Sequence, residues 1–260
     1  ISINHKLGNT LVKTNPEKVI IFDMGLLDIY DSFDLKVGGV AKDSLPNQLK
    51  KFDTDEIINA GTLFEPNFES IAAYAPDLII ISGRTSKHYD ELSKISPTLY
   101  LGRDSSDEGY LASIKSNVDV LKAIYTKHKF SDIMSELEVK LNELKTKVNA
   151  ANYSTLFAMA NGDEVKAFGP KSRYDVVFNE FGFKSVDANF DTSTHGATVT
   201  FEFINSLQPD VMIVMDRAQV TGGATLAKEL LNNDFVTNTP AFKENRIIYV
   251  DPSNWYLTEG

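Results

Sequence analysis

The sequence predicts an α/β protein with two similar lobes, each a mainly parallel sheet flanked by helices, and a repeated segment carries the prediction. The stretch Phe68 to Arg84 (FESIAAYAPDLIIISGR) recurs as Phe201 to Arg217 (FEFINSLQPDVMIVMDR), with Phe, Glu, Ile, Pro, Asp, a second Ile and Arg unchanged. Each copy reads as an amphipathic helix, a Pro-Asp pair and an apolar run of strand length. The copies lie about half a chain apart, so each half contains one.

The first lobe, residues 1–129, alternates strand and helix patterns around the first copy. The expected elements outside that copy are a strand at 19–22, a helix at 24–33, a strand at 35–41, a helix at 86–95 and a strand at 98–101. Parallel strands need long crossover connections, which are usually helical, so this alternation predicts a mainly parallel sheet.

One long helix is expected at residues 130–150, inside a stretch without glycine or proline that runs from Gly109 to Gly162. Its apolar residues form one stripe, at Leu137, Leu141, Leu144 and Val148. About 20 residues at 1.5 Å each give roughly 30 Å, the width of a small domain. The helix either packs on the second lobe or forms a rigid strut joining the lobes, and its position near the middle of the chain favours the strut.

The second lobe, residues 151–260, mirrors the first. Its expected elements outside the second copy are a strand at 154–160, a turn at 161–164, a strand at 165–169, a helix at 174–183, a helix at 225–235 and a strand at 246–251. Gly182 is a plausible end for the helix at 174–183.

Composition limits the classes of partner. The formal net charge of -10 argues against nucleic acid and against anionic membrane surfaces as partners. Cysteine is absent, which excludes disulfides and thiolate metal sites. The longest apolar runs fall short of a membrane span, and the chain begins without a methionine or a signal sequence, as expected of a mature exported protein.

Arginine is scarce, which draws attention to where it occurs. Only five of the 26 basic residues are arginine, and two of them, Arg84 and Arg217, close the two copies of the repeat. In open α/β sheets ligands bind at the carboxyl ends of the strands. Two lobes facing one cleft would set these guanidiniums opposite each other, and such a pair favours an anionic ligand.

Two further segments are candidate parts of a binding site. His195 lies in the polar loop DTSTHGATVT beside a glycine that permits close approach of backbone or ligand, although a lone loop histidine is more often structural. The final segment, DPSNWYLTEG, places Trp255 and Tyr256 just after the last strand, either projecting towards the arginines or packing a loop onto the lobe.

The motifs IISGR with SKHYDEL, FGPKSR, THG, VMDR and DPSNWYLTEG resemble, in order and spacing, the iron-siderophore substrate-binding proteins of ABC importers. The resemblance is closest to members of the catecholate, or enterochelin-binding, type and covers the chain from about Val19 to Gly260. It implies the class III fold, in which two α/β lobes are bridged by one long helix. It also implies an extracytoplasmic protein, periplasmic or anchored to the membrane as a surface lipoprotein.

The resemblance further implies a ligand and a site. A ferric catecholate siderophore would be held by Arg84, Arg173 and Arg217 and passed by a monomeric receptor to an ABC permease in the membrane. Fe(III) would arrive only as part of the siderophore complex, with no intrinsic cofactor. Trp255 is expected to be a further ligand-binding residue, and His195 and Tyr256 match positions that can ligate the iron directly. Ferric iron prefers hard oxygen donors and accepts imidazole, and a tetradentate bis-catecholate leaves two of its six positions open.

Other functions remain as alternatives at this point. Haem or a corrinoid would suit the same fold, but three arginines exceed what two haem propionates need. A hydrolase using His195 lacks an activated nucleophile, and the sequence contains no GxSxG, HExxH or GxGxxG motif, so no enzymatic activity is expected. A zinc receptor would need more ligands than His195. Members of the family usually continue past the Trp-Tyr loop, so the sequence is expected to be truncated after Gly260.

Overall fold

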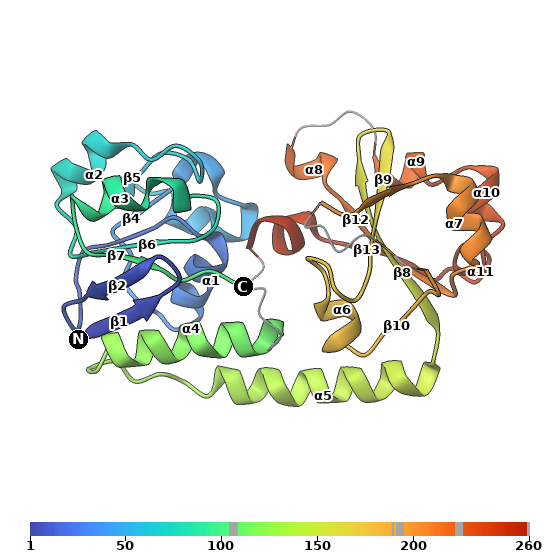
Figure 1. Cartoon of the computed structure of the whole chain (residues 1–260), viewed down its shortest axis with the longest axis horizontal. Helices are drawn as coiled ribbons and strands as arrows, with labels where there is room; N and C mark the ends of the chain where they lie inside the picture. Colours follow the sequence, from blue (N-terminus) through green and yellow to red (C-terminus); the bar gives the residue numbers. More distant parts are fainter. Residues whose placement is uncertain (104–108, 189, 191–194, 222–225, 259–260) are drawn as a thin grey trace. The chain divides into compact units, whose positions relative to one another are not determined.

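The computed structural model describes residues 1–103, 109–188, 190, 195–221 and 226–258, which separate into two compact units. Unit 1 comprises Ile1–Asp104, Ala112–Ile133 and Leu257–Gly260, and unit 2 comprises Ser105–Leu111 and Met134–Tyr256. Each unit holds a sheet flanked by helices, so the predicted fold class is confirmed (Figure 1). Part of the loop predicted around His195, residues 191–194, lies outside the described residues.

Unit 1 is built on five parallel strands in the order β5-β4-β3-β6-β7. The strands are β3 (Val19–Ile21), β4 (Gly39–Val40), β5 (Ile58–Asn59), β6 (Leu78–Ile81) and β7 (Thr98–Tyr100). The helices are α1 (Met24–Ser32), α2 (Phe68–Tyr74), α3 (Tyr89–Ser93) and α4 (Tyr110–Ile124), with short 3₁₀ turns η1 (Lys42–Ser44), η2 (Asn47–Phe52) and η3 (Ser86–His88). In Figure 1, α2 and α3 lie on one face of the sheet and α1 on the other.

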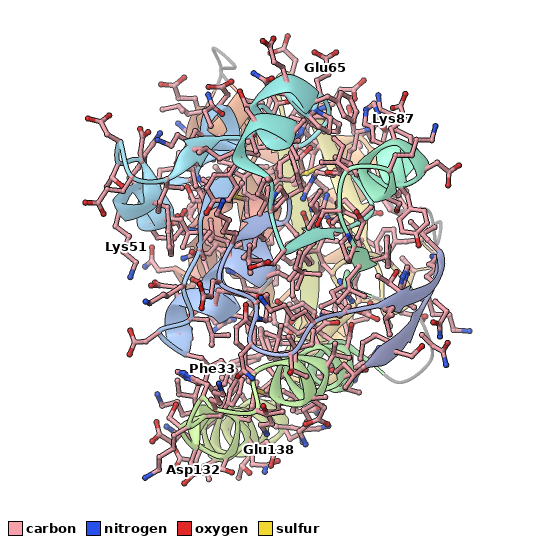
Figure 2. The ribbon with its side chains drawn as sticks, turned by 90° about the vertical axis from the view of Figure 1, so that its left-hand side faces the viewer. Phe33, Lys51, Glu65, Lys87, Asp132 and Glu138 are labelled. Atoms are coloured by element: carbon pink, nitrogen blue, oxygen red, sulfur yellow. The ribbon has the colours of Figure 1, made fainter. Side chains whose placement is uncertain are left out.

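An antiparallel hairpin of β1 (Ser2–His5) and β2 (Gly8–Leu11) adds to unit 1 and was not expected from the sequence. Figure 2 looks onto this unit and shows charged side chains, among them Lys51, Glu65 and Lys87, extending from its surface. Phe33, at the end of α1, packs edge-on against Phe130 at a ring separation of 5.0 Å. The segment that precedes the long helix thus packs against the end of α1.

Unit 2 contains a mixed sheet in the order β11-β9-β8-β12-β13, with β10 also paired to β8. Its strands are β8 (Ser154–Asn161), β9 (Glu164–Phe168), β10 (Lys184–Ser185), β11 (Ala197–Val199), β12 (Val211–Asp216) and β13 (Ile247–Val250). The pairs that β12 forms with β8 and β13 are parallel, as is the pair of β10 with β8, whereas β9 is antiparallel to β8 and β11.

Alternation along β8 divides the core of unit 2 into two layers. Leu156, Ala158 and Ala160 face one layer, whereas Phe157 and Met159 face the other. The first layer packs under α7 (Phe201–Leu207), α9 (Ala227–Leu230), α10 (Asp234–Thr237) and α11 (Pro240–Lys243). The second packs against α6 (Val176–Asn179) and the C-terminal turn η4 (Ser253–Thr258). Successive side chains of a strand point to opposite faces, which accounts for the division.

The helix α5 (Ile133–Ala151), 19 residues long, fills the Gly- and Pro-free stretch and begins where the unit boundary falls. The predicted stripe is present, because Leu137, Leu141, Leu144 and Val148 are partly buried while most of the helix is exposed. None of its side chains is fully buried.

Two predicted helices are shorter than their sequence patterns. The pattern at 225–235 gives α9 and α10 separately, because the Asn233 side chain accepts hydrogen bonds from Phe235 N and Val236 N and so starts a second helix. The pattern at 174–183 gives only α6, which ends at Asn179, and Gly182 lies beyond it with φ of +84°. A single turn therefore replaces the longer helix.

The two copies of the repeat adopt the same local structure. The Asn67 side chain caps α2 and the Thr200 side chain caps α7. Each helix ends in a left-handed residue directly before the proline, Ala75 with φ of 51° and Gln208 with φ of 43°. The two copies are therefore similar in backbone conformation as well as in sequence.

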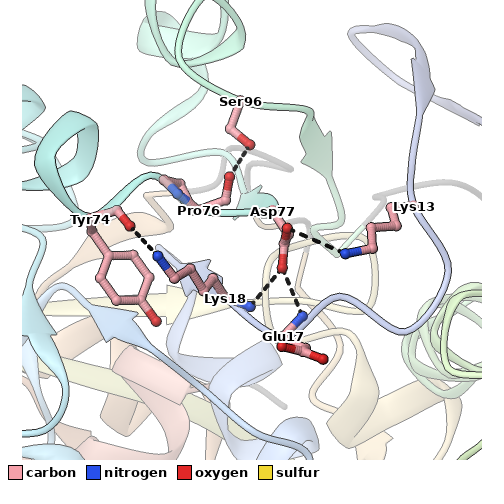
Figure 3. Close-up of polar contacts among 7 residues, drawn as sticks. All are labelled: Lys13, Glu17, Lys18, Tyr74, Pro76, Asp77 and Ser96. Carbon is pink, nitrogen blue, oxygen red and sulfur yellow. Dashed lines mark hydrogen bonds and ion pairs between the residues drawn. The ribbon is translucent and has the colours of Figure 1, made fainter.

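The aspartate of each Pro-Asp pair is hydrogen-bonded to the residue at the start of the unit's first parallel strand. Asp77 N donates to Lys18 O at 2.8 Å, and the Asp77 carboxylate accepts from Lys18 N at 3.1 Å and Glu17 N at 2.9 Å (Figure 3). Asp210 makes the same two-way contact with Ser154, donating to its carbonyl at 2.9 Å and accepting from its N at 3.0 Å. These backbone hydrogen bonds lower the pKa of both carboxyls.

Candidate functional site

Arg84 lies at the point where the strand order of unit 1 reverses direction. The chain winds from β3 outward to β4 and β5, then crosses to β6 on the other side of β3, so the carboxyl ends of β3 and β6 flank the switch point where ligands bind in open sheets. Asp23 follows β3, while Ser82 and Arg84 follow β6. The sequence predicted that Arg84 would lie at the carboxyl end of a parallel strand, and it does.

Asp23 is the acidic group at this edge. Its side chain caps α1 by accepting from Leu26 N at 2.8 Å. Burial raises the pKa of the Asp23 carboxyl, while a hydrogen bond with Ser82, backbone hydrogen bonds and the charge of Arg84 act in the opposite direction. Arg84 is thus electrostatically coupled to a carboxyl group within its own unit.

Arg217 occupies the corresponding position in unit 2, immediately after β12 and beside the end of β8. Its N–H donates to Ala160 O at 3.0 Å, which continues the parallel ladder between these strands. Its guanidinium donates from Nη1 to Asn161 Oδ1 at the end of β8. Both the backbone and the head group of Arg217 are therefore held by β8.

Tyr256 brings Arg217 and Arg173 into one group. The guanidinium carbons of Arg173 and Arg217 lie 4.8 Å and 5.2 Å from the centroid of the Tyr256 ring, and Arg173 Nη2 donates to Tyr256 O at 2.9 Å. Arg173 also lies 5.4 Å from the ring of Tyr174. Two cations against one phenol ring form a positively charged, aromatic surface that suits an anionic aryl ligand.

The segment before α6 presents Arg173. Ser172 N and Ser172 Oγ both donate to Gly169 O, at 3.1 Å and 2.7 Å, and Asp175 N donates to Ser172 O at 3.1 Å. Gly169 follows β9, so a tight turn carries the chain from the sheet to the arginine. Ser172 is buried, which anchors the turn.

Trp255 fixes the turn that carries Tyr256. Its ring stacks on Phe157 at 5.6 Å and meets Phe181 edge-on at 6.1 Å. The turn begins at Asp251, whose carbonyl accepts from Trp255 N at 3.0 Å and whose carboxylate accepts from Ser253 N at 2.8 Å. Of the two interpretations of this segment, packing applies to Trp255, while Tyr256 meets the arginines.

His195 is exposed and precedes β11. The adjacent Gly196 has φ of 71°, and a β-carbon there would lie 2.7 Å from Cζ of Phe168, so only glycine fits. Phe168 in turn packs edge-on against Tyr174 at 4.8 Å. His195 therefore lies on a different element from Arg173, Arg217 and Tyr256. Its neighbour Gly196 packs against Phe168, which belongs to the same aromatic core as Tyr174.

Three residues beside the candidate arginines of the two units were not singled out by the sequence: Asp23 in unit 1, and Asn161 and Tyr174 in unit 2. Asp23 and Asn161 each lie at the carboxyl end of the strand that neighbours the repeated strand. A search for polar residues after the first strand of each lobe would have found both. Tyr174 adjoins Arg173 in the sequence but was interpreted as part of a helix.

Metal-binding clusters and membrane-spanning helices are both absent from the described ranges. No group of three or more His, Cys, Asp or Glu side chains in these ranges is arranged to hold a metal ion. No helix in the described part of the chain is long and apolar enough to cross a membrane.

Residues 22–254 match the profile of a family described as periplasmic binding protein. The petrobactin-binding protein YclQ of Bacillus subtilis is 39% identical over 265 residues, which cover 100% of this chain and 83% of YclQ. Its crystal structure has a TM-score of 0.91 at 38% identity and covers 99% of this chain and 92% of its own.

Two further relatives carry similar names. The ferric-anguibactin-binding protein FatB of Vibrio anguillarum is 32% identical, covering 100% of this chain and 82% of FatB. The crystal structure of the periplasmic catecholate-siderophore binding protein VctP from Vibrio cholerae has a TM-score of 0.90 at 32% identity, covering 99% of this chain and 93% of VctP.

Proposed function

The chain belongs to the periplasmic binding protein family, and we propose that it captures a ferric catecholate siderophore outside the cytoplasm and delivers it to an ABC-type permease. The proposal rests on one observation above all, the grouping of Arg173 and Arg217 around Tyr256 in unit 2. A ferric bis- or tris-catecholate is anionic and aromatic, and this surface offers guanidinium donors beside aromatic rings.

The relatives support this ligand class over haem or a corrinoid. YclQ is named for petrobactin, FatB for ferric anguibactin and VctP for catecholate siderophores. They are named as binding proteins, which supports a receptor rather than an enzyme. Arg84 is proposed as the contribution of unit 1 to ligand binding, on the basis of its place at the switch point.

Direct ligation of iron by His195 and Tyr256 is the finer part of the proposal. The phenol of Tyr256 is a hard oxygen donor of the kind that ferric iron prefers, and the imidazole of His195 is an acceptable nitrogen donor. Both would be used only if the siderophore leaves coordination positions open. Trp255 is proposed to support the Tyr256 turn and to act as a fluorescent reporter of binding.

The location and partners proposed here are those that suit a member of this family. A periplasmic protein and a membrane-anchored surface lipoprotein both suit the proposed role, with the permease as the protein partner and the receptor acting as a monomer. The net charge of -10 makes a local basic surface necessary for capturing an anion.

The test is substitution of Arg84, Arg173 and Arg217, one at a time, by Ala and by Lys. Each Ala variant is expected to bind a ferric catecholate about 1.5 to 3 kcal/mol more weakly, the usual scale of a hydrogen bond to a charged group. The Lys variants should recover only part of the loss, because they lack the bidentate fork. Unchanged affinity in all three Ala variants would refute the arginine site.

A further inference from the structure

We propose that Asn161 is a positioning residue that orients Arg217 towards the anionic ligand without itself neutralising the guanidinium charge. The proposal deepens the function proposed above and rests on Arg217 being a ligand-binding residue. It also explains why the last residue of β8 carries an amide and not a carboxylate.

Arg217 is held at its backbone and at its head group. Its N–H donates to Ala160 O at 3.0 Å, and its carbonyl accepts from Val220 N at 3.1 Å and from Thr221 N and Oγ1 at 3.1 Å and 3.0 Å. At the other end, Nη1 donates to Asn161 Oδ1. A long flexible side chain loses entropy when a ligand immobilises it, so holding it in advance reduces that cost.

Asn161 is itself well placed to hold another group. It is the last residue of β8 and lies opposite Glu164 in the hairpin with β9. Gly162, with φ of +64°, makes the turn between them. The amide therefore stands at the end of a strand whose register is fixed from both sides, by β9 and by β12.

The chemistry of the partner decides how much charge remains for the ligand. An amide oxygen accepts a hydrogen bond from a guanidinium without carrying a charge, whereas a carboxylate would form an ion pair. The adjacent carboxylate, Asp216, is buried and accepts from Ala218 N at 3.1 Å, Ala227 N at 2.8 Å and Gln219 Nε2 at 3.2 Å. Its hydrogen-bonding capacity is directed to those groups.

The other arginine of unit 2 also has a neutral acceptor among its partners. Arg173 donates to a backbone carbonyl, that of Tyr256, which is also a neutral acceptor. In unit 1 the corresponding strand end carries a carboxyl group, Asp23, in electrostatic contact with Arg84. At Arg217 the acceptor at the strand end is thus a neutral amide, whereas the corresponding strand end beside Arg84 carries a carboxyl group.

The central experiment compares Asn161→Asp with the parent protein in titrations with ferric complexes of a synthetic bis-catecholamide and a tris-catecholamide, followed by Trp255 fluorescence. Asn161→Asp keeps an acceptor oxygen but adds a charge, so affinity should fall about tenfold or more. The dependence of affinity on salt should become shallower, because one favourable charge interaction is removed. Asn232→Asp, an exposed asparagine after α9, adds the same charge elsewhere and should leave affinity nearly unchanged.

A second pair of variants separates this proposal from the one on which it rests. Asn161→Ala removes orientation without adding charge and should weaken binding by about threefold with the salt dependence retained, and it should have no effect once Arg217 is replaced by Ala. If Arg217→Ala weakens binding but neither Asn161 variant does, the positioning role is wrong. If Arg217→Ala itself has no effect, the proposed function of Arg217 fails instead. Should Asn161→Asp not fold, the Asn161→Ala cycle alone decides.

Discussion

Residue by residue, the repeated segment separates positions that build the fold from a position that does not. Ile71 and Ile204 are fully buried in α2 and α7, and Asp77 and Asp210 fasten the first parallel strands. These roles explain why such residues recur. The arginine at the end of each copy has no comparable part in the core, since Arg84 and Arg217 lie partly exposed at the carboxyl ends of the strands. Ligand binding explains a recurrent positive charge at this edge better than a role in folding does.

The sharpest residue-scale prediction concerns Tyr256 and His195. If they complete the coordination of a tetradentate ferric catecholate, Tyr256 binds as phenolate, with its proton displaced by the metal. Tyr256→Phe should then abolish a tyrosinate-to-iron charge-transfer contribution in the visible spectrum while preserving the ring between the two arginines. His195→Ala should weaken a tetradentate ligand much more than a hexadentate one.

The hexadentate ligand serves as the control for the tetradentate one. A hexadentate tris-catecholate already fills the iron's six positions, so loss of a protein ligand should matter little. Equal losses for both ligand types in both variants would show that His195 and Tyr256 only line the site.

At the scale of elements, the Pro-Asp pair explains how each repeated strand is set beside its neighbour. Asp77 joins the start of β6 to the start of β3, and Asp210 joins the start of β12 to the start of β8. Register fixed at the amino ends of these strands carries through to their carboxyl ends, where the arginines lie. The aspartate contact and the candidate arginine thus lie at opposite ends of the same pair of strands in each unit.

This contact predicts a dependence of stability on acid. The pKa of both carboxyls lies below the ordinary value of 3.8, because the folded state binds the carboxylate form through backbone hydrogen bonds. Their stabilisation is therefore complete above that value and is lost as pH falls through the lower folded-state pKa. Asp77→Asn and Asp210→Asn should each reduce the free energy of unfolding by about 1 to 3 kcal/mol at neutral pH.

Chemical denaturation at a series of pH values measures this effect. The difference between each variant and the parent should shrink as the solution is acidified below pH 3.8. Asp132→Asn, an exposed aspartate just before α5, serves as the matched control. A difference that stays constant down to the acid transition would contradict the assigned cause.

For the whole molecule, the repeat predicted two α/β units, and the Gly- and Pro-free stretch with its apolar stripe predicted the long helix α5, because these patterns are local. The short strands β5, β10 and β11 span only two or three residues, too few for periodicity to reveal. The contact of Tyr256 with two arginines depends on tertiary packing of η4 against α6 and β12, which local patterns do not specify. Arg84 and Arg217 were therefore predictable from the repeat, and Arg173 from the family resemblance, but the contact of Asn161 with Arg217 was not.

The helix α5 leads to a prediction about ligand-induced motion. It links the two units in sequence without glycine or proline, and such a helix resists the wide hinge bending that flexible crossovers allow. Small-angle scattering of the free and loaded protein should therefore show little change in the radius of gyration. A large decrease on loading would refute the rigid link.

The central claim, that this protein binds ferric catecholates, is tested most directly by titrating the fluorescence of its only tryptophan with ferric bis- and tris-catecholates, haem and a corrinoid. Trp255 adjoins Tyr256 in the same turn, so a ligand bound at the arginines should quench its emission. We expect saturable quenching by a ferric catecholate at concentrations well below those at which haem or the corrinoid acts. Absence of quenching by every ferric catecholate, or tighter binding of haem, would contradict the account.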